Sequence, residues 1–242
     1  MSLLFETAPD GIHTYFDWLL QGLGWTLSLG FSAWILALTI GTLAGAARTL
    51  KTGFWAKTAQ FYVEIFRNVP LLVQMFLWFF VVPELVPEAL GRAIKSMPPP
   101  WASFFPALLC LSLYTGARLA EQVRAGIEAL ARGQSQASAA LGFETGGTYR
   151  YILLPQAFRI IIPTLTNEFM TIFKNTSVAL TIGLIELTAT AQAISENTFR
   201  TFEAFGVVTL IYLTIALIAW RTMRGIERAL RLPGGSGDEA RA

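Results

Sequence analysis

Charged residues are scarce in this sequence. Asp, Glu, Lys and Arg make up only 14% of the 242 residues, whereas soluble domains carry about a quarter. Hydrophobic residues account for 54% of the chain, and the mean hydropathy is +0.52. The net charge of +2 gives no reason to expect nucleic acid as a partner. The composition therefore excludes an ordinary soluble domain and favours a membrane protein.

Residues that support chemistry are also few. The single cysteine, Cys110, lies in an apolar run and has no second thiol with which to form a disulfide. The single histidine, His13, is isolated near the N-terminus, and no His, Cys or Asp cluster has metal-ligand spacing. The sequence contains no G-x-x-x-x-G-K-[ST] phosphate loop and no paired nucleophile and base. We therefore expect a chain that hydrolyses nothing and binds no metal or cofactor of its own.

Long apolar segments dominate what is present. A hydrocarbon core of about 30 Å needs about 20 helical residues, and five segments meet or approach this length. They cover residues 18–47, 57–82, 101–119, 151–185 and 205–221. We expect an all-α fold, a polytopic bundle of five transmembrane helices that forms one domain over residues 1–242. The Pro-rich stretch 83–100, the polar segment 118–150 and the polar link 186–203 are expected to be loops, apart from a short helix near residue 137.

The basic residues predict the orientation of this bundle. Those in the loops after the first, third and fifth spans greatly outnumber those on the other side, which are Arg92, Lys95 and Arg200. Cytoplasmic loops of membrane proteins carry the excess of Lys and Arg. The pattern therefore predicts an N-terminus outside the cytoplasm and a C-terminus inside it, with the segment 133–150 also in the cytoplasm.

The segment 133–150 interrupts the membrane-like pattern with small residues. Ser135 is expected to cap a short helix, and Gly142 is expected to end it in the left-handed conformation. Ala137, Ala140 and Leu141 fall on one side of that helix at helical spacing. A side with such small residues can enter a groove on another protein. Short Ala-rich surface helices are common, however, so this composition alone does not show that the helix docks on a partner.

The spacing within and after this helix resembles the cytoplasmic "EAA" loop of ABC-importer membrane subunits. Gln136, Ala137 and Ser138 match Glu-Ala-Ala, Gly142 matches the following Gly, and Ile152, Leu154 and Pro155 match Ile-x-Leu-Pro. The Glu of the family pattern is replaced here by Gln136, and its second Ala by Ser138. The resemblance implies a coupling helix that docks on a separate ATPase dimer, which binds the ATP and Mg²⁺. The residues it assigns to this contact are Ser135, Gln136, Ala137, Ala140, Leu141, Gly142 and Pro155. It also implies a second permease subunit, identical or homologous, and a periplasmic binding protein that delivers the substrate.

Polar residues in the second span indicate a functional surface or an internal ion pair. The span carries Glu64, Arg67, Asn68 and Gln74 around Pro70, and such residues are costly in hydrocarbon unless they face a bundle interior, a partner or water. Glu64 and Arg67 are three residues apart and could pair with each other. Alternatively, Arg67 lies near a translocation pathway.

The fourth apolar segment carries a polar stripe. At 100° per residue, Asn167, Glu168, Thr171, Lys174 and Asn175 share an arc of about 120°. A membrane helix with such a stripe lines a cavity or packs on polar partners. We expect this stripe, with Arg67, to meet a small charged or zwitterionic substrate; the alternative is that Glu168 and Lys174 form salt bridges with other helices.

Two prolines precede or interrupt this stripe. Pro155 and Pro163 cannot donate the backbone hydrogen bonds of a helix. We hypothesise that they form a bend between the coupling helix and the polar stripe and carry movement from one to the other. The alternative is that they only shape a static helix.

Several longer segments indicate the cargo. The run YVEIFRNVPLLVQMF resembles the polar-amino-acid branch of these permeases of the bacterial inner membrane, and NEFMTIFKNTSVALTIGLIE is most similar to glutamate/aspartate importers. Lys174 or Arg67 would suit an acidic amino acid as counter-charge, whereas Glu168 would not. A basic or neutral polar amino acid, such as histidine, arginine or glutamine, remains an alternative cargo. A passive channel, or a scaffold subunit in the lipid membrane with no pumping role, is an alternative of another class.

Overall fold

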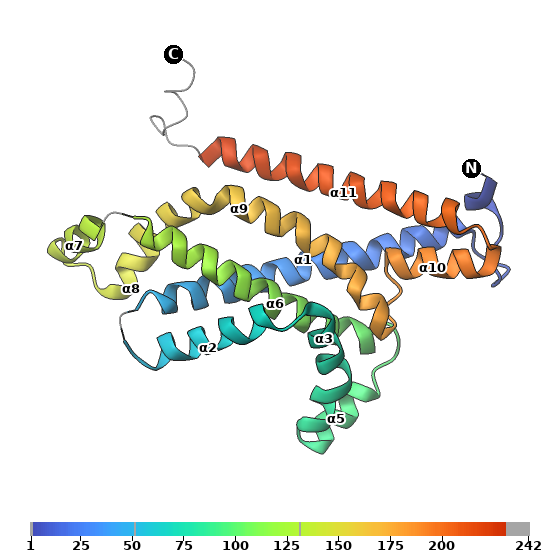
Figure 1. The fold of residues 1–242 in the computed structure, drawn as a ribbon, viewed down its shortest axis with the longest axis horizontal. Helices are drawn as coiled ribbons and strands as arrows, with labels where there is room; N and C mark the ends of the chain where they lie inside the picture. Colours follow the sequence, from blue (N-terminus) through green and yellow to red (C-terminus); the bar gives the residue numbers. More distant parts are fainter. Residues whose placement is uncertain (1, 51, 131, 231–242) are drawn as a thin grey trace, which may run out of the picture.

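The computed structural model describes residues 2–50, 52–130 and 132–230, and these ranges contain helices but no β-strand. The all-α prediction is therefore confirmed. Three helices are long and apolar enough to cross a membrane, and two bent helix pairs each have the length and composition of one further span. The five predicted spans thus correspond to three straight and two broken elements (Figure 1).

The first span is helix α1, Tyr15–Arg48, after a short 3₁₀ turn, η1, at Ser2–Phe5. Thr14 caps it: the Thr14 hydroxyl accepts the Asp17 N–H, and the Asp17 carboxylate accepts the Thr14 N–H at 2.8 Å. Its 34 residues reach about 51 Å, more than a bilayer core of about 30 Å requires. The prediction for residues 18–47 is confirmed within three residues at each end.

Helix α6, Trp101–Glu128, packs along α1 through glycines. A Cβ atom on Gly45 would lie 2.6 Å from the Ala120 carbonyl oxygen, and one on Gly41 would lie 2.6 Å from Leu119 Cβ. Only residues without a side chain permit this approach of two backbones. The prediction that the third span ends at residue 119 is wrong, because α6 continues for nine residues into the segment expected to be a loop. There Glu121 and Gln122 bind side chains of other helices, whereas Arg124 and Glu128 pair within α6, so these polar residues do not end the helix.

The second predicted span is not one continuous helix. Helix α2, Phe54–Asn68, ends before Pro70, and α3, Leu71–Phe76, starts a second arm at 108° to the first. Val69, which precedes the proline, is extended, as steric contact with a proline ring favours. The Gln74 amide donates to the carbonyls of Phe66 and Val69 at 2.9 and 2.8 Å, so it satisfies acceptors near the break.

The arm beyond the break projects from the bundle (Figure 1). It continues through η2, a π-type turn at Leu77–Val81, into α4, Val82–Leu85, and α5, Glu88–Lys95. The prediction of a loop over residues 83–100 is therefore wrong for residues 83–85 and 88–95, which are helical. Within α5, Glu88 and Arg92 pair one turn apart, and Lys95 reaches back to Glu84 on α4.

The second half of the chain contains the other broken span. After α6 the chain forms α7, Arg132–Ala140. The broken span then begins with α8, Thr145–Thr148, and a π-type turn, η3, Tyr149–Leu153. Helix α9, Leu154–Asn175, follows and runs into a 3₁₀ segment, η4, Thr176–Ile182. The predicted link 186–203 contains a helix, α10, Leu187–Thr198, and α11 extends over Thr201–Leu230, longer than the predicted 205–221.

The ends of these elements gather at two poles of the molecule. In Figure 1, the C-terminal ends of α1 and α11 lie toward the same pole as α7 and α8, whereas the start of α1 and α10 lie at the opposite pole. The main core between the poles joins α1, α6 and α9 through buried residues such as Ala37, Leu119, Ala157 and Ile172. Helix α11 packs on α9 and α10 at the outside of this core.

Candidate functional site

Glu168 is the buried end of a salt bridge between α9 and α6. Its carboxylate is 6% exposed and accepts two bonds from Arg118, at 2.7 Å from Nη2 and 2.9 Å from Nε. The Gln122 amide adds a third bond at 3.2 Å. The helices come this close because Gly126 faces Ala157 and Ile161, where a Cβ atom would be 2.7 Å from Ile161 Cγ2. The structure therefore forms, for Glu168, the interhelical salt bridge that the sequence left open as an alternative.

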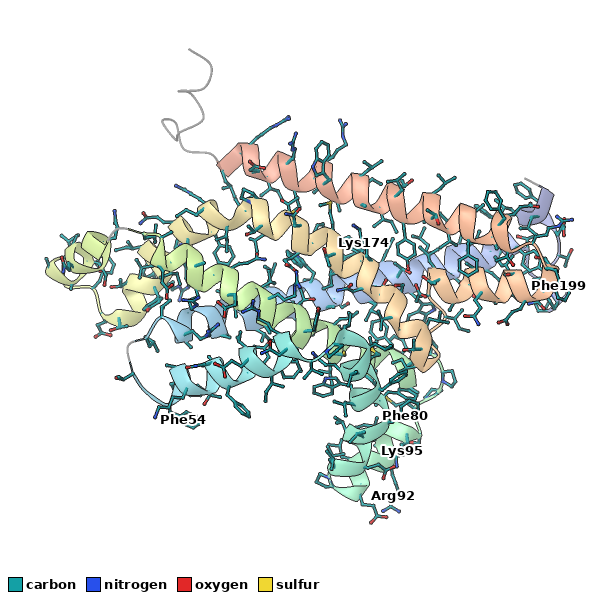
Figure 2. The ribbon with its side chains drawn as sticks, viewed as in Figure 1. Phe54, Phe80, Arg92, Lys95, Lys174 and Phe199 are labelled. Carbon is teal, nitrogen blue, oxygen red and sulfur yellow. The ribbon has the colours of Figure 1, made fainter. Side chains whose placement is uncertain are left out.

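Lys174 differs from Glu168. It is exposed, and it forms no ion pair within the ranges that the structure describes. Asn167 is exposed on the same side, and Thr171, between them, donates its hydroxyl to the Asn167 carbonyl at 2.7 Å. Figure 2 shows Lys174 midway along the bundle, whereas Arg92 and Lys95 lie at the tip of the arm. The predicted stripe thus divides into one residue that faces α6 and a group that faces outward, with Asn175 partly buried beside it.

Arg118 joins the outward group from the neighbouring helix. Its side chain is 42% exposed although its guanidinium holds Glu168. The rest of α6 is mostly buried, and its less buried face carries Tyr114, Gln122 and Ala125 at helical spacing from Arg118. Sequence reasoning missed Arg118 because the third span was ended one residue after it. The i, i+4 spacing of Arg118 and Gln122 was the available signal.

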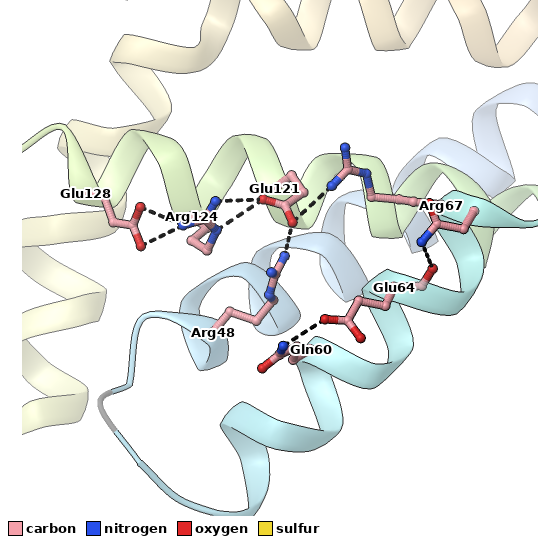
Figure 3. Close-up of polar contacts among 8 residues, drawn as sticks. Arg48, Gln60, Glu64, Arg67, Glu121, Arg124 and Glu128 are labelled. Carbon is pink, nitrogen blue, oxygen red and sulfur yellow. Dashed lines mark hydrogen bonds and ion pairs between the residues drawn. The ribbon is translucent and has the colours of Figure 1, made fainter.

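Arg67 belongs to a second charged cluster, centred on Glu121 of α6. Glu121 pairs with Arg48 of α1, with Arg67 of α2 at 3.0 Å and with Arg124 at 3.0 Å (Figure 3). Arg124 also binds Glu128 one turn further on, at 2.7 Å. The Glu64–Arg67 pair considered from the sequence is not formed, because Arg67 turns to α6. This cluster ties the ends of three helices together and leaves Arg67 half-exposed.

Glu64 makes a different contact. Its carboxylate accepts the Gln60 amide at 2.7 Å, and its carbonyl accepts the Asn68 amide at 2.7 Å. Both bonds join residues of α2 to each other. Lys57, Gln60, Glu64 and Arg67 therefore form a polar face along α2.

The segment assigned to ATPase contact forms a compact turn at one pole of the molecule (Figure 1). The prediction that Ser135 caps the helix is wrong: α7 begins three residues earlier, and the Ser135 carbonyl accepts the Ser138 hydroxyl at 2.9 Å within it. Gly142 ends the helix with φ +83°, as predicted. Ser138 is buried and bonds the Thr148 hydroxyl at 3.0 Å, which fixes α7 against α8. The predicted contact residues on this turn are exposed: Ser135, Gln136, Ala137, Ala140, Leu141 and Gly142.

Pro155 and Pro163 lie in the path from this turn to Glu168. Pro155 is in the first turn of α9, directly after the π-type turn η3, where a missing N–H is tolerated. Pro163 is inside α9, and nearby Thr164 and Thr166 donate their hydroxyls to the carbonyls of Ile161 and Ile162. Both prolines are exposed, and Pro163 lies one turn before Asn167 on the same side of α9. The chain therefore runs from α8 to Lys174 through one helix with two proline sites.

Comparison with known proteins identifies the family to which this chain belongs. Residues 37–232 match the family model of the binding-protein-dependent transport system inner membrane component. The glutamate/aspartate import permease protein GltJ of Escherichia coli K12 is 42% identical over 97% of this chain and 96% of its own. The arginine transport system permease protein ArtQ of Bacillus subtilis is 32% identical over 88% of this chain and 92% of its own.

Solved structures agree with this assignment. A crystal structure of an amino acid ABC transporter with histidines superposes with a TM-score of 0.73 at 29% identity, over 89% of this chain and 95% of the other. The inward-facing MetNI methionine ABC transporter has a TM-score of 0.72 at 17% identity, over 94% and 100% of the two chains, and shares the fold. From its family, its relatives and its fold, this chain belongs to the inner membrane components of binding-protein-dependent transport systems, as a permease of the amino acid ABC importers.

Proposed function

We propose that this permease carries acidic amino acids, glutamate or aspartate, through the membrane. The observation that supports this cargo is the difference between Glu168 and Lys174. The negative charge of Glu168 is held by Arg118 and Gln122 and is almost wholly covered. Lys174 and part of the Arg118 guanidinium remain open. The open surface is therefore cationic, which suits a substrate with one more carboxylate than ammonium group.

The substrate contacts follow from this surface. Lys174 and Arg118 are the counter-charges, and the outward Asn167, Thr171 and Asn175 supply polar groups beside them. Glu168 acts through Arg118, whose guanidinium it orients from the buried side. Arg67 is the half-exposed cation of the cluster on α2 and α6 and extends the cationic surface. The name of the relative GltJ, at 42% identity, supports the same cargo, and the more distant arginine permease ArtQ represents the alternative.

The driving force comes from partners. This chain supplies the passage and no ATPase site; an ATPase dimer binds ATP and Mg²⁺ and docks on the exposed residues of α7. A second permease subunit completes the pore, and a periplasmic binding protein delivers the substrate. Movement of α7 reaches the substrate surface through α9, with Pro155 and Pro163 as the bend. Uphill transport requires that the inward- and outward-facing states bind the substrate with different affinity.

The orientation follows the distribution of charge. The pole that holds α7 and the C-terminal ends of α1 and α11 (Figure 1) also holds most of the basic residues, including Arg48, Arg124, Arg224 and Arg228. The excess of Lys and Arg marks the cytoplasmic side. We therefore place this pole in the cytoplasm and the N-terminal turn in the periplasm.

The test is competition for uptake. The complete importer, with its ATPase and binding protein, is reconstituted in vesicles, and uptake of labelled glutamate is measured with excess unlabelled amino acids. We expect glutamate and aspartate to compete and to stimulate ATP hydrolysis, and arginine, histidine and glutamine to compete at least tenfold more weakly. Competition by arginine or histidine in place of aspartate would refute the acidic cargo. Uptake that is indifferent to ATP would refute the pump in favour of a passive channel.

A further inference from the structure

A basic cavity lies where the ends of α1, α2 and α6 meet. Its volume is about 800 Å³, and its polar lining consists of Arg48, Thr52, Lys57, Gln60 and Arg124. Three of these five side chains are cations, and no acidic residue lines it within the part of the chain that the structure describes. The cavity is separate from Glu168 and Lys174, and the proposed passage of substrate does not use it. A concave site with several cations and no anion selects an anionic ligand.

The charges around the cavity are not fully neutralised from within. Arg48 and Arg124 share one carboxylate, Glu121, which also binds Arg67 (Figure 3). Lys57 is exposed and forms no ion pair among the described residues. With Glu64 and Glu128 counted, the whole group, which includes Arg67 outside the lining, holds four cations and three carboxylates. The carboxylates stand outside the lining, so the cavity itself remains electropositive.

The start of α2 adds to the positive electrostatic potential of the cavity. Gly53 is at the N-cap position with φ +128°, and no side chain accepts the first N–H groups of the helix. Gly53, Phe54 and Ala56 line the cavity at this point. Unpaired N–H groups and the positive end of the helix dipole favour an anion there. This feature strengthens the case that the cations of the cavity already make.

An apolar strip next to the cavity indicates what kind of anion it takes. Phe54 and Trp55 are 73% and 69% exposed at the start of α2, and Phe61 and Ile65 continue the exposed apolar side along the helix. Aromatic residues at such positions are typical of the boundary between headgroups and hydrocarbon. Free phosphate would use the cavity alone and leave this strip unused. A phospholipid uses both, with its headgroup in the cavity and an acyl chain on the strip.

We propose that this cavity binds the headgroup of an anionic phospholipid from the inner leaflet. The inference rests on the proposed orientation, which puts the ends of α1 and α6 at the cytoplasmic surface. Basic pockets between transmembrane helices on that side are suited to anionic lipid headgroups. The bound phosphate contacts Arg48, Lys57 and Arg124 together, so the lipid holds the α1–α2 connection against α6.

Lipid retention by the purified importer complex tests this site. Native mass spectrometry counts bound lipid while phosphatidylglycerol or phosphatidylcholine is titrated, without substrate. Thr52→Glu places an anion in the lining, and Thr52→Gln is its neutral control of matched size. Lys57→Gln removes the unpaired cation, and Lys95→Gln removes a lysine on the distant arm. We expect each charge change in the cavity to weaken phosphatidylglycerol binding about fivefold, and neither control to change it.

Three outcomes would overturn the proposal. The first is retention of phosphatidylcholine by the unmodified protein as strong as that of phosphatidylglycerol, and the second is unchanged retention of phosphatidylglycerol by both Thr52→Glu and Lys57→Gln. Displacement of the lipid by millimolar inorganic phosphate would assign the cavity to a free anion. Glutamate uptake by the same variants is measured separately, so a wrong cargo and a wrong lipid site give different results.

Discussion

The two sides of α9 carry similar polar residues in very different surroundings. Toward α6, Glu168 is buried and holds Arg118 with two charged hydrogen bonds. On the outward side, Asn167 and Lys174 are exposed, and Lys174 forms no ion pair among the described residues. A buried pair is costly to break, because removal of one partner leaves the other charge uncompensated. A lone exposed cation can be changed at little cost to the fold. The first side is therefore structural, and the second is free to bind substrate.

The largest expected effect comes from the buried side. Glu168→Ala leaves Arg118 without its carboxylate between two closely packed helices. Because the Arg118 side chain is 42% exposed and water can solvate its charge, we expect a loss of about 2 kcal/mol in stability, or about 4–8 °C in the melting temperature of the purified complex, together with loss of uptake. Differential scanning fluorimetry and a transport assay measure the two.

Glu128→Ala is the matched control for this change. Glu128 also pairs with an arginine of α6, Arg124, but its side chain is 52% exposed. Exposed ion pairs contribute about 0–1 kcal/mol, so the melting temperature of this variant should hardly move. Equal destabilisation by the two variants would remove the distinction between the buried and the outward side.

On the outward side of α9, we expect a substitution to lower uptake without lowering stability. Lys174→Gln removes the open cation, and a hydrogen bond to a charged group contributes about 1.5–3 kcal/mol. We expect uptake of glutamate to fall roughly tenfold to a hundredfold, mainly through a higher KM, with an unchanged melting temperature. Lys174→Arg keeps the charge and should retain most of the uptake. If Lys174→Gln and Lys174→Arg lowered uptake equally, the charge of Lys174 would not be what binds the substrate.

The smallest effect is expected at Thr171. Its hydroxyl donates to the Asn167 carbonyl of its own helix, so Thr171→Val removes this local bond together with the polar group that faces the substrate. We expect about a fivefold loss in kcat/KM, equivalent to about 1 kcal/mol. Thr209→Val is the control, because Thr209 makes the same local bond to the Phe205 carbonyl on α11. A similar loss at both threonines would indicate a change in helix stability and not in substrate contact.

Some elements of the fold follow from the sequence because their causes are local. The long apolar run over residues 18–47 predicts α1, since a hydrophobic segment of this length acts locally. Gly142 predicts the end of α7, because a left-handed residue is a local requirement. The start of α7 was predicted three residues too late, because Ser135 is of a type that can cap a helix, whereas α7 begins at Arg132.

Other elements depend on contacts between distant residues. The length of α6 was underestimated because Arg118, Glu121 and Arg124 look like the start of a loop. In the folded chain Arg118 pairs with α9 and Glu121 pairs with α1 and α2, while Arg124 pairs with Glu121 and Glu128 of its own helix, and these contacts keep the three residues in α6. The bend of 108° after α2 is likewise set by more than Pro70, since Gln74 binds two carbonyls near the break. Neither set of partners can be read from the hydropathy of one segment.

The sequence by itself determined that this chain spans a membrane, that a small-residue segment precedes its fourth span, and that five polar residues share one arc of α9. Those properties depend on composition and on the helical repeat, which are fixed by neighbouring residues. Only the tertiary structure decided that Glu168 faces Arg118 while Lys174 stays open. The helical repeat gives the angles between side chains but not the identity of the helix that each one meets. That depends on how α6 and α9 pack, and a glycine, Gly126, sets their approach.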